Sequence, residues 1–133
     1  MKDSLLNYGF EEVKSLLIGR DEKPFRATQI FKALHSGLEF SEMTELSKPL
    51  RESLSEEFSA QTVKIIKTLK SVDGTEKFLF LLNDGNVIEG VLMKYSYGNT
   101  LCVSTQVGCR MGCKFCASGL HGLVRNLTAG EIL

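Results

Sequence analysis

The chain of 133 residues is organised around Cys109-Arg110-Met111-Gly112-Cys113-Lys114-Phe115-Cys116, where three thiols follow C-x3-C-x2-C spacing. Three thiolates bind soft or borderline metals, which leaves zinc and iron–sulfur clusters as the main candidates. Structural zinc requires four ligands in a closed tetrahedron, and Cys102 or His121 could supply the fourth. A four-iron cluster held by three cysteines instead leaves one iron open to chelate a substrate.

The composition argues for a reducing compartment. No apolar run approaches the roughly 20 residues of a membrane-spanning helix, and the N-terminus lacks the apolar region of a signal peptide. We therefore expect a cytoplasmic protein without a membrane association, in which clustered cysteines bind metal or perform redox chemistry. The net charge is zero, and a small basic excess around the cysteines permits contact with phosphate groups.

The first part of the chain predicts a small helical domain over residues 1–60. Apolar residues recur there at helical spacing, as Phe10, Val13 and Leu17 do. The domain carries 11 acidic and 8 basic side chains. This balance favours a solvated face over a nucleic-acid contact for its basic residues.

Residues 61–99 predict a small antiparallel β meander. Asp73-Gly74 and Asn83-Asp84-Gly85-Asn86 are hairpin signals, and strands are expected over residues 62–70, 77–82 and 87–94. In the last of these, Glu89 is the only acid on two largely apolar faces. A carboxylate on an apolar face must be paired or its pKa rises, which makes Glu89 a candidate general base. A solvated strand edge explains the residue equally well.

A fourth strand is expected over residues 100–107, leading directly into the cysteine loop. It carries Cys102 on its more polar face. A lone cysteine in a strand is usually inert core, but the polar neighbours and the nearby loop argue for a role. Thr128 and Glu131 then match a capping box. A helix therefore begins at the last residues, and its stop at Leu133 indicates a fragment.

The cysteine motif, with an aromatic residue before its last Cys, resembles the cluster motif of radical S-adenosylmethionine (SAM) enzymes. The surrounding sequence is similar to the adenosine C2 methyltransferases that modify 23S ribosomal RNA and tRNA. The similar stretches are Leu101-Cys102-Val103-Ser104-Thr105-Gln106-Val107-Gly108-Cys109, Cys113-Lys114-Phe115-Cys116-Ala117, Arg125-Asn126-Leu127-Thr128 and, in the accessory domain, Phe25-Arg26-Ala27-Thr28-Gln29-Ile30-Phe31 and Glu42-Met43-Thr44. The C8-methylating antibiotic-resistance enzymes share much of this sequence. The resemblance covers nearly the whole chain, but only the first third or so of a full-length member.

This resemblance implies a role for each unusual residue. Cys109, Cys113 and Cys116 match the ligands of a [4Fe-4S] cluster whose open iron chelates SAM for reductive cleavage. Glu89 matches the base that removes the adenine C2 proton, although Gly90 follows it where Thr is common. Cys102 matches the thiol that attacks a methylated cysteine and releases the product through a transient disulfide. The methyl-carrying cysteine has no counterpart here, so the polypeptide alone is expected to be inactive.

The expected fold is an α+β fragment in three parts. These are a helical accessory domain (1–60, RNA-contacting by resemblance), a β meander (61–99), and the first strand, cluster loop and helix start of a truncated radical SAM α/β barrel (100–133). The family further implies 23S rRNA and tRNA as partners, a flavodoxin-type electron donor and a monomer when full length. The alternative is a zinc-binding RNA-interaction module, with the three loop thiols and either His121 or Cys102 as ligands.

Overall fold

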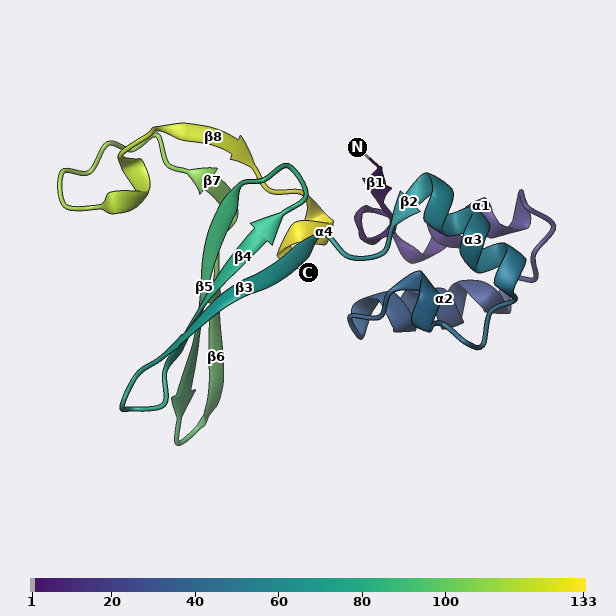
Figure 1. The fold of residues 1–133 in the computed structure, drawn as a ribbon, viewed down its shortest axis with the longest axis horizontal. Helices are drawn as coiled ribbons and strands as arrows, with labels where there is room; N and C mark the ends of the chain where they lie inside the picture. The colour runs from purple at the N-terminus through teal and green to yellow at the C-terminus, as the bar shows by residue number, and fades with distance from the viewer. Residues whose placement is uncertain (1) are drawn as a thin grey trace. The chain divides into compact units, whose positions relative to one another are not determined.

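Helices form in the first part of the chain and strands in the second, as the computed structural model shows for the described residues 2–133 (Figure 1). The chain divides into two units at the junction of Thr62 and Val63. The helical unit precedes this junction and the sheet unit follows it. This α+β organisation confirms the predicted class, while the start of a barrel stays a prediction.

The helical unit contains three α-helices that match the apolar periodicity of the sequence. They are α1 (Phe10–Ile18), α2 (Phe25–His35) and α3 (Lys48–Glu57). Two 3-10 turns, η1 (Leu5–Asn7) and η2 (Phe40–Glu42), and a short parallel pair of strands, β1 (Asp3–Ser4) with β2 (Phe58–Ser59), complete the unit.

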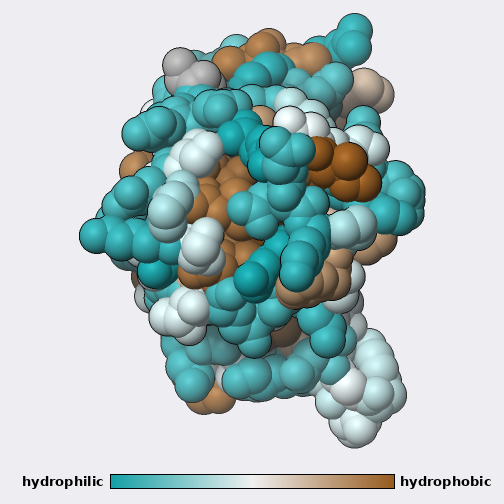
Figure 2. All heavy atoms as spheres, turned by 90° about the vertical axis from the view of Figure 1, so that its right-hand side faces the viewer, coloured by the Kyte–Doolittle hydropathy of each residue, from teal (hydrophilic) through white to brown (hydrophobic). Residues whose placement is uncertain are grey.

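One well-packed core holds the helical unit together. It contains 13 buried hydrophobic residues, among which Val13, Leu17, Ile30 and Leu54 are fully inaccessible to solvent. Each occupies the apolar stripe of its helix, so burial follows directly from the 3.6-residue period. Figure 2 looks onto this unit and shows a mainly hydrophilic face with hydrophobic surface visible between the polar side chains.

The sheet unit begins with an antiparallel meander that contains the three strands predicted over residues 61–99 and a fourth, which the prediction assigned to the start of the barrel. Its strands, in spatial order, are β3 (Val63–Lys70), β4 (Glu76–Leu82), β5 (Val87–Tyr95) and β6 (Gly98–Val103). Both hairpin signals form turns, at Gly74 (φ +88°) and Gly85 (φ +86°). In each turn the preceding aspartate accepts a backbone N–H two residues on, at 3.0 Å. This Asx geometry is the reason that Asp-Gly marks a turn.

The prediction of a single strand over residues 100–107 was wrong. β6 ends at Val103, and β7 (Gln106–Gly108) pairs with β8 (Leu123–Asn126) in a separate two-stranded sheet. The Ser104 hydroxyl donates to the Glu89 carbonyl (2.8 Å), and the Thr105 carbonyl accepts the Leu127 N–H (3.0 Å). These bonds end the pairing with β5 and turn the chain toward its C-terminal segment.

The last elements are η3 (Ala117–Gly119), within the cysteine loop, and α4 (Ala129–Ile132). One of the two hydrogen bonds of the predicted capping box is present: the Thr128 N–H donates to the Glu131 carboxylate at 2.9 Å. The core of the sheet unit is small: Leu82, Ile88 and Val107 are buried, with Val63, Phe80 and Leu127 packed against them. This core joins the β7–β8 hairpin to the sheet and thereby positions the cysteine loop.

Candidate functional site

The cysteine loop spans residues 109–122 and is closed at its base. The Cys109 N–H donates to the Gly122 carbonyl at 3.1 Å. A Cβ on Gly108, which has φ +74°, would lie 2.1 Å from the same carbonyl oxygen. Only glycine therefore fits where the two arms of the loop meet. This close approach fixes both ends of the segment that carries the three thiols.

The three loop cysteines are free thiols on a loop that is mostly exposed to solvent. Cys109 is half-buried, whereas Cys113 and Cys116 are exposed. Within the described residues, no three His, Cys, Asp or Glu side chains gather closely enough to hold a metal ion. The structure therefore does not bring the predicted ligands to one point. The donor chemistry fits a soft metal or a cluster, because three unoxidised thiols lie within eight residues of one closed loop.

Cys116 has an environment that favours the thiolate. Hydrogen bonds from the backbone N–H and the hydroxyl of Ser118, followed by the Gly119 N–H, lower the pKa of the Cys116 thiol. The thiolate is the metal-binding form of cysteine. The residues that follow the motif therefore prepare its last cysteine for ligation.

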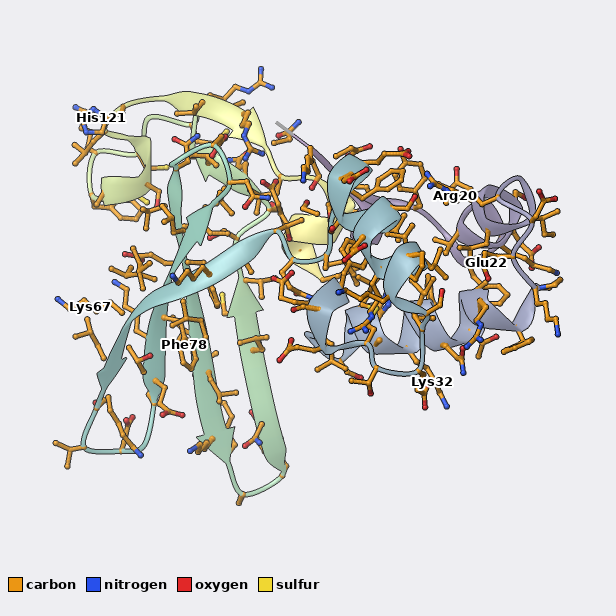
Figure 3. All side chains as sticks on the ribbon, turned by 45° about the vertical axis from the view of Figure 1, so that its right-hand side comes forward. Arg20, Glu22, Lys32, Lys67, Phe78 and His121 are labelled. Atoms are coloured by element: carbon orange, nitrogen blue, oxygen red, sulfur yellow. The ribbon has the colours of Figure 1, made fainter. Side chains whose placement is uncertain are left out.

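The two candidates for a fourth zinc ligand do not join the loop thiols. His121 is exposed, and Figure 3 shows it near the end of the loop. Cys102 lies in β6, opposite Val91 of β5. Neither is part of a cluster of three His, Cys, Asp or Glu side chains that could hold a metal ion, among the residues that the structure describes.

Glu89 is ion-paired and open to solvent. Its carboxylate lies 3.0 Å from the ammonium of Lys77 on β4, and its side chain is 57% exposed. The sequence left two explanations open: a carboxylate on an apolar face, as a candidate base, and a carboxylate that is simply solvated. The structure favours the solvated carboxylate, with Lys77 as its partner. The strand is central rather than an edge, because β5 lies between β4 and β6. The role of Glu89 as a proton acceptor stays a prediction from resemblance.

The strand register places Glu89 and Cys102 on one face of the sheet. Cys102 is opposite Val91, which is two residues from Glu89 on the same strand. Side chains two apart in a strand share a face. Glu89 also lines a hollow of about 290 Å³, with Ser104 on one side and Ala117 and Ser118 of the cysteine loop on another. The candidate base therefore lies beside the end of the cluster motif.

Sequence reasoning missed the residue that connects the loop's second arm to the sheet. The Arg125 guanidinium on β8 donates to Asp84 at 2.7 Å and forms a bidentate pair with Glu131 at 2.7 and 2.8 Å. The Arg125 hydrogen bond holds the pKa of Asp84 down to about 2, helped by the Asn86 N–H. Arg125 likewise lowers the pKa of Glu131. Arg125 lies in a stretch similar to the family, Asp84 in a hairpin signal and Glu131 in the capping box, but no local pattern indicates that these side chains pair.

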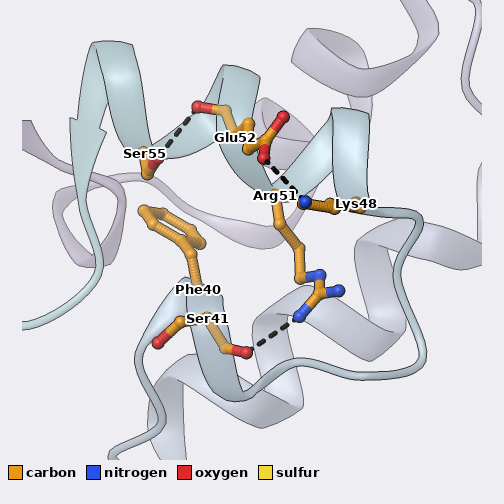
Figure 4. Close-up of a pocket in the computed structure, with 6 residues that line it drawn as sticks. All are labelled: Phe40, Ser41, Lys48, Arg51, Glu52 and Ser55. Carbon is orange, nitrogen blue, oxygen red and sulfur yellow. Dashed lines mark hydrogen bonds and ion pairs between the residues drawn. The ribbon is translucent and has the colours of Figure 1, made fainter.

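The helical unit contains a second hollow, of about 220 Å³, beside α3 (Figure 4). Arg51 donates to the Ser41 carbonyl at 2.8 Å, and its buried Nε has no partner among the described residues. Lys48 lies 3.8 Å from Glu52 at the same opening. Two cations and the Glu52 carboxylate therefore line this hollow.

Comparison with known proteins gives one consistent result. Residues 4–60 match the family described as the ribosomal RNA large subunit methyltransferase N-terminal domain. The whole chain is similar to proteins named probable dual-specificity RNA methyltransferase RlmN. Those from Clostridium botulinum (strain Loch Maree) and Alkaliphilus oremlandii are 51% and 54% identical, over 98% and 99% of this chain. The chain spans about two fifths of the length of these relatives, 39% in both cases.

A solved structure agrees with the sequence relatives. The crystal structure of a radical SAM methyltransferase from Sphaerobacter thermophilus matches 98% of this chain with a TM-score of 0.90 and 39% identity. The match covers 39% of that protein. No helix among the described residues is long and apolar enough to cross a membrane.

Proposed function

We propose that the chain is the N-terminal part of an RlmN-type radical SAM RNA methyltransferase, and that the full-length protein methylates adenine C2 in 23S rRNA and tRNA. The observation that carries the proposal is the match over nearly the whole chain at about half identity. The match includes the cysteine loop and the β5–β6 pair that carries Glu89 and Cys102.

Cys109, Cys113 and Cys116 would hold a [4Fe-4S] cluster. When bound, this group supplies the reductive cleavage of SAM. The protein contributes three thiols on a loop whose ends are fixed by Gly108 and Gly122. The lowered pKa of Cys116 favours the thiolate, which is the metal-binding form.

Glu89 accepts the adenine C2 proton in this proposal. Adenine C2 is an electron-poor ring carbon, so its substitution requires a base that removes the proton after the new bond has formed. Glu89 is a carboxylate at a solvent-open hollow beside the cysteine loop, 3.0 Å from the Lys77 ammonium. An ionised carboxylate is the form that can accept a proton.

Cys102 supplies the thiol that releases the product. It is exposed, unoxidised and on the same sheet face as Glu89. It would form a transient disulfide with the methyl-carrying cysteine, which is none of the four cysteines of this sequence. We therefore propose that activity requires the remainder of the protein.

The helical unit serves as the RNA-contacting accessory domain. The open hollow that is lined by Lys48 and Arg51 offers a cationic contact for phosphate. A flavodoxin-type protein delivers the electron. The full-length protein acts as a monomer in the cytoplasm.

Anaerobic reconstitution with iron and sulfide tests the cluster assignment. The full-length protein should turn brown, with broad absorption at roughly 400 nm. Cys116→Ala should abolish this colour, whereas Cys102→Ala should keep it. A protein that retains one tightly bound zinc and takes up no iron would show a zinc-binding RNA module instead.

Single-turnover methylation tests the role of Glu89. In full-length protein, Glu89→Gln should allow the covalent RNA adduct to form and should block its release. The matched control is Glu76→Gln, because Glu76 is also ion-paired to a lysine, Lys94 at 3.5 Å, but lies on the other face of the sheet. Normal turnover by Glu89→Gln would refute the assignment.

A further inference from the structure

The strand register defines one face of the sheet by its lysines. Lys64 and Lys67 of β3 lie opposite Leu81 and Leu79 of β4, and Leu79 lies opposite Glu89 of β5. These positions share a face with Lys77, which contacts Glu89 directly. We call this the lysine face; it carries Lys64, Lys67, Lys77, Glu89, Cys102 and Tyr95, interspersed with the apolar side chains of Leu79, Leu81, Val87, Val91 and Met93.

The lysine face carries an unbalanced positive charge. Lys77 is paired with Glu89, whereas neither Lys64 nor Lys67 forms an ion pair within residues 2–133. Figure 3 shows the Lys67 side chain pointing out from β3 into solvent. The opposite face has a different character, because Phe80 there packs against the core that holds the β7–β8 hairpin.

The lysine face ends in a pair of stacked tyrosines. Tyr95 and Tyr97 have ring centroids 5.0 Å apart and planes inclined by 12°. The Tyr95 hydroxyl lies 3.3 Å from the Met93 sulfur, which places its ring on the same face as Met93 and Glu89. Tyr97 is 80% exposed. An aromatic face of this kind, open to solvent, is available for a further stacking partner.

We propose that the lysine face is the docking surface for a single-stranded segment of the substrate RNA. Phosphates contact Lys64 and Lys67, and one base stacks on Tyr97. Exposed aromatic rings next to a basic groove or face are the usual means of binding single-stranded RNA. Tyr95 is six residues from Glu89, a distance of about 20 Å along the strand. The RNA therefore crosses the sheet between the tyrosines and the residues that perform the chemistry.

Protection of the sheet edge explains the observations less well. Lysines on an edge strand prevent pairing with other chains, and β3 is an edge strand. That function does not account for two exposed tyrosines stacked at the β5–β6 turn, which is not at this edge. The charge, the aromatic pair and the shared face with Glu89 and Cys102 are explained together by RNA. This inference rests on the proposed RNA-modifying function.

Salt-dependent binding tests the lysines. The probe is a fluorescently labelled RNA hairpin with an adenine-containing loop, and the protein is full length. Lys64→Gln with Lys67→Gln should weaken binding by about tenfold and reduce the slope of log K against log salt by about 1.4, since each phosphate contact contributes about 0.7. Lys70→Gln is the matched control: Lys70 lies on the same strand, opposite Glu76 and on the other face. An unchanged slope in the double variant would overturn the proposal.

A second pair of variants tests the stacking. Tyr97→Ala should weaken binding of the same hairpin by about tenfold, and Tyr97→Phe should preserve it, because a phenyl ring still stacks. Equal binding by Tyr97→Ala and wild type would overturn the aromatic part of the proposal. If the lysine and tyrosine variants bound RNA normally but no longer bound another protein, the face would be a protein interface instead.

A methylation assay on the wild-type protein separates this inference from the proposed function. Absence of methyl transfer, together with the expected change of salt slope, would refute the reaction while keeping the RNA surface. Methyl transfer by a wild-type protein whose lysine and tyrosine variants bind normally would keep the reaction and refute the surface.

Discussion

At the residue scale, Arg125 joins the end of the chain to a turn that is distant in the sequence. Its guanidinium contacts Asp84 in the β4–β5 turn and Glu131 in α4, and the residue itself lies in β8. The Glu131 side chain is only 8% exposed, so its charge depends on this partner. A bidentate arginine–carboxylate pair fixes geometry as well as charge. Arg125 therefore holds the second arm of the cysteine loop against the sheet.

Acid should weaken this bridge. The folded-state pKa of Asp84 is about 2, below its ordinary value of 3.8, so its stabilisation is complete above about pH 4 and is lost as the pH falls toward 2. Asp84→Asn should lower the free energy of unfolding of the sheet unit by about 1 kcal/mol at pH 7 and should flatten its decline below pH 4. Denaturant titrations between pH 7 and pH 2 measure both effects.

The control for this substitution is Asp73→Asn. Asp73 accepts the equivalent backbone bond in the β3–β4 turn, from Thr75, but no arginine contacts it. A loss of stability equal to that of Asp84→Asn would show that the turn, and not the Arg125 bridge, is responsible.

Gly108 should tolerate no side chain. Alanine there requires φ +74° and places its Cβ 2.1 Å from the Gly122 carbonyl, so the base of the loop must open. We expect Gly108→Ala to cost more than about 2 kcal/mol and to deprotect the Cys109 amide in hydrogen exchange. Gly112→Ala has a similar φ, +65°, but no atom within 4 Å. It should cost only about 1 kcal/mol, and an equal cost at both positions would contradict the steric argument.

At the element scale, the break between β6 and β7 depends on side-chain chemistry. The Ser104 hydroxyl bonds the Glu89 carbonyl at the point where the chain leaves the sheet. Ser104→Ala should destabilise this junction by about 1 kcal/mol and accelerate amide exchange at the ends of β5 and β6. Ser96→Ala in the β5–β6 turn removes a hydroxyl without a hydrogen bond among the described residues, so it should leave that exchange unchanged.

Local patterns predicted most elements, because their causes are local. The stripes of α1 and α3 and the Asp-Gly turns each lie within a few residues of sequence. The end of β6 could not be predicted, since alternation continues through Ser104 and Thr105, and the strand stops at bonds to Glu89 and Leu127 that no local pattern indicates. Strand β8 was missed because its four residues show too short a pattern.

The candidate site was likewise predictable only in part. The identities of Glu89, Cys102 and the loop cysteines could be chosen from the sequence. Their arrangement could not, because it depends on strand register. The Lys77 partner of Glu89 lies across a hairpin, and the Arg125 bridge joins β8 to the distant β4–β5 turn. Register depends on the exact turn geometry and on which face of the sheet is buried, and the strand patterns here did not specify either to the residue.

At the scale of the whole molecule, the two units have very unequal cores. The helical unit buries 13 hydrophobic residues, whereas the sheet unit buries three. Several large apolar side chains of the sheet remain exposed, including Ile65 at 54% and Leu101 at 57%. Since burial of apolar surface is the main source of stability, the sheet unit should open at a lower free energy than the helical unit.

Hydrogen exchange on the 133-residue chain can test this order directly. Amides of β3–β6 should exchange sooner than those of α1–α3, because little buried apolar surface protects them. Leu54→Ala removes a fully buried side chain and should lower protection in the helices by about 3 kcal/mol. Ile18→Ala, at a side chain 51% exposed, should lower it by less than about 1 kcal/mol. If Leu54→Ala reduced protection of the sheet and the helices equally, the two cores would unfold as one cooperative unit. The small core of the sheet unit would then not determine when that unit opens.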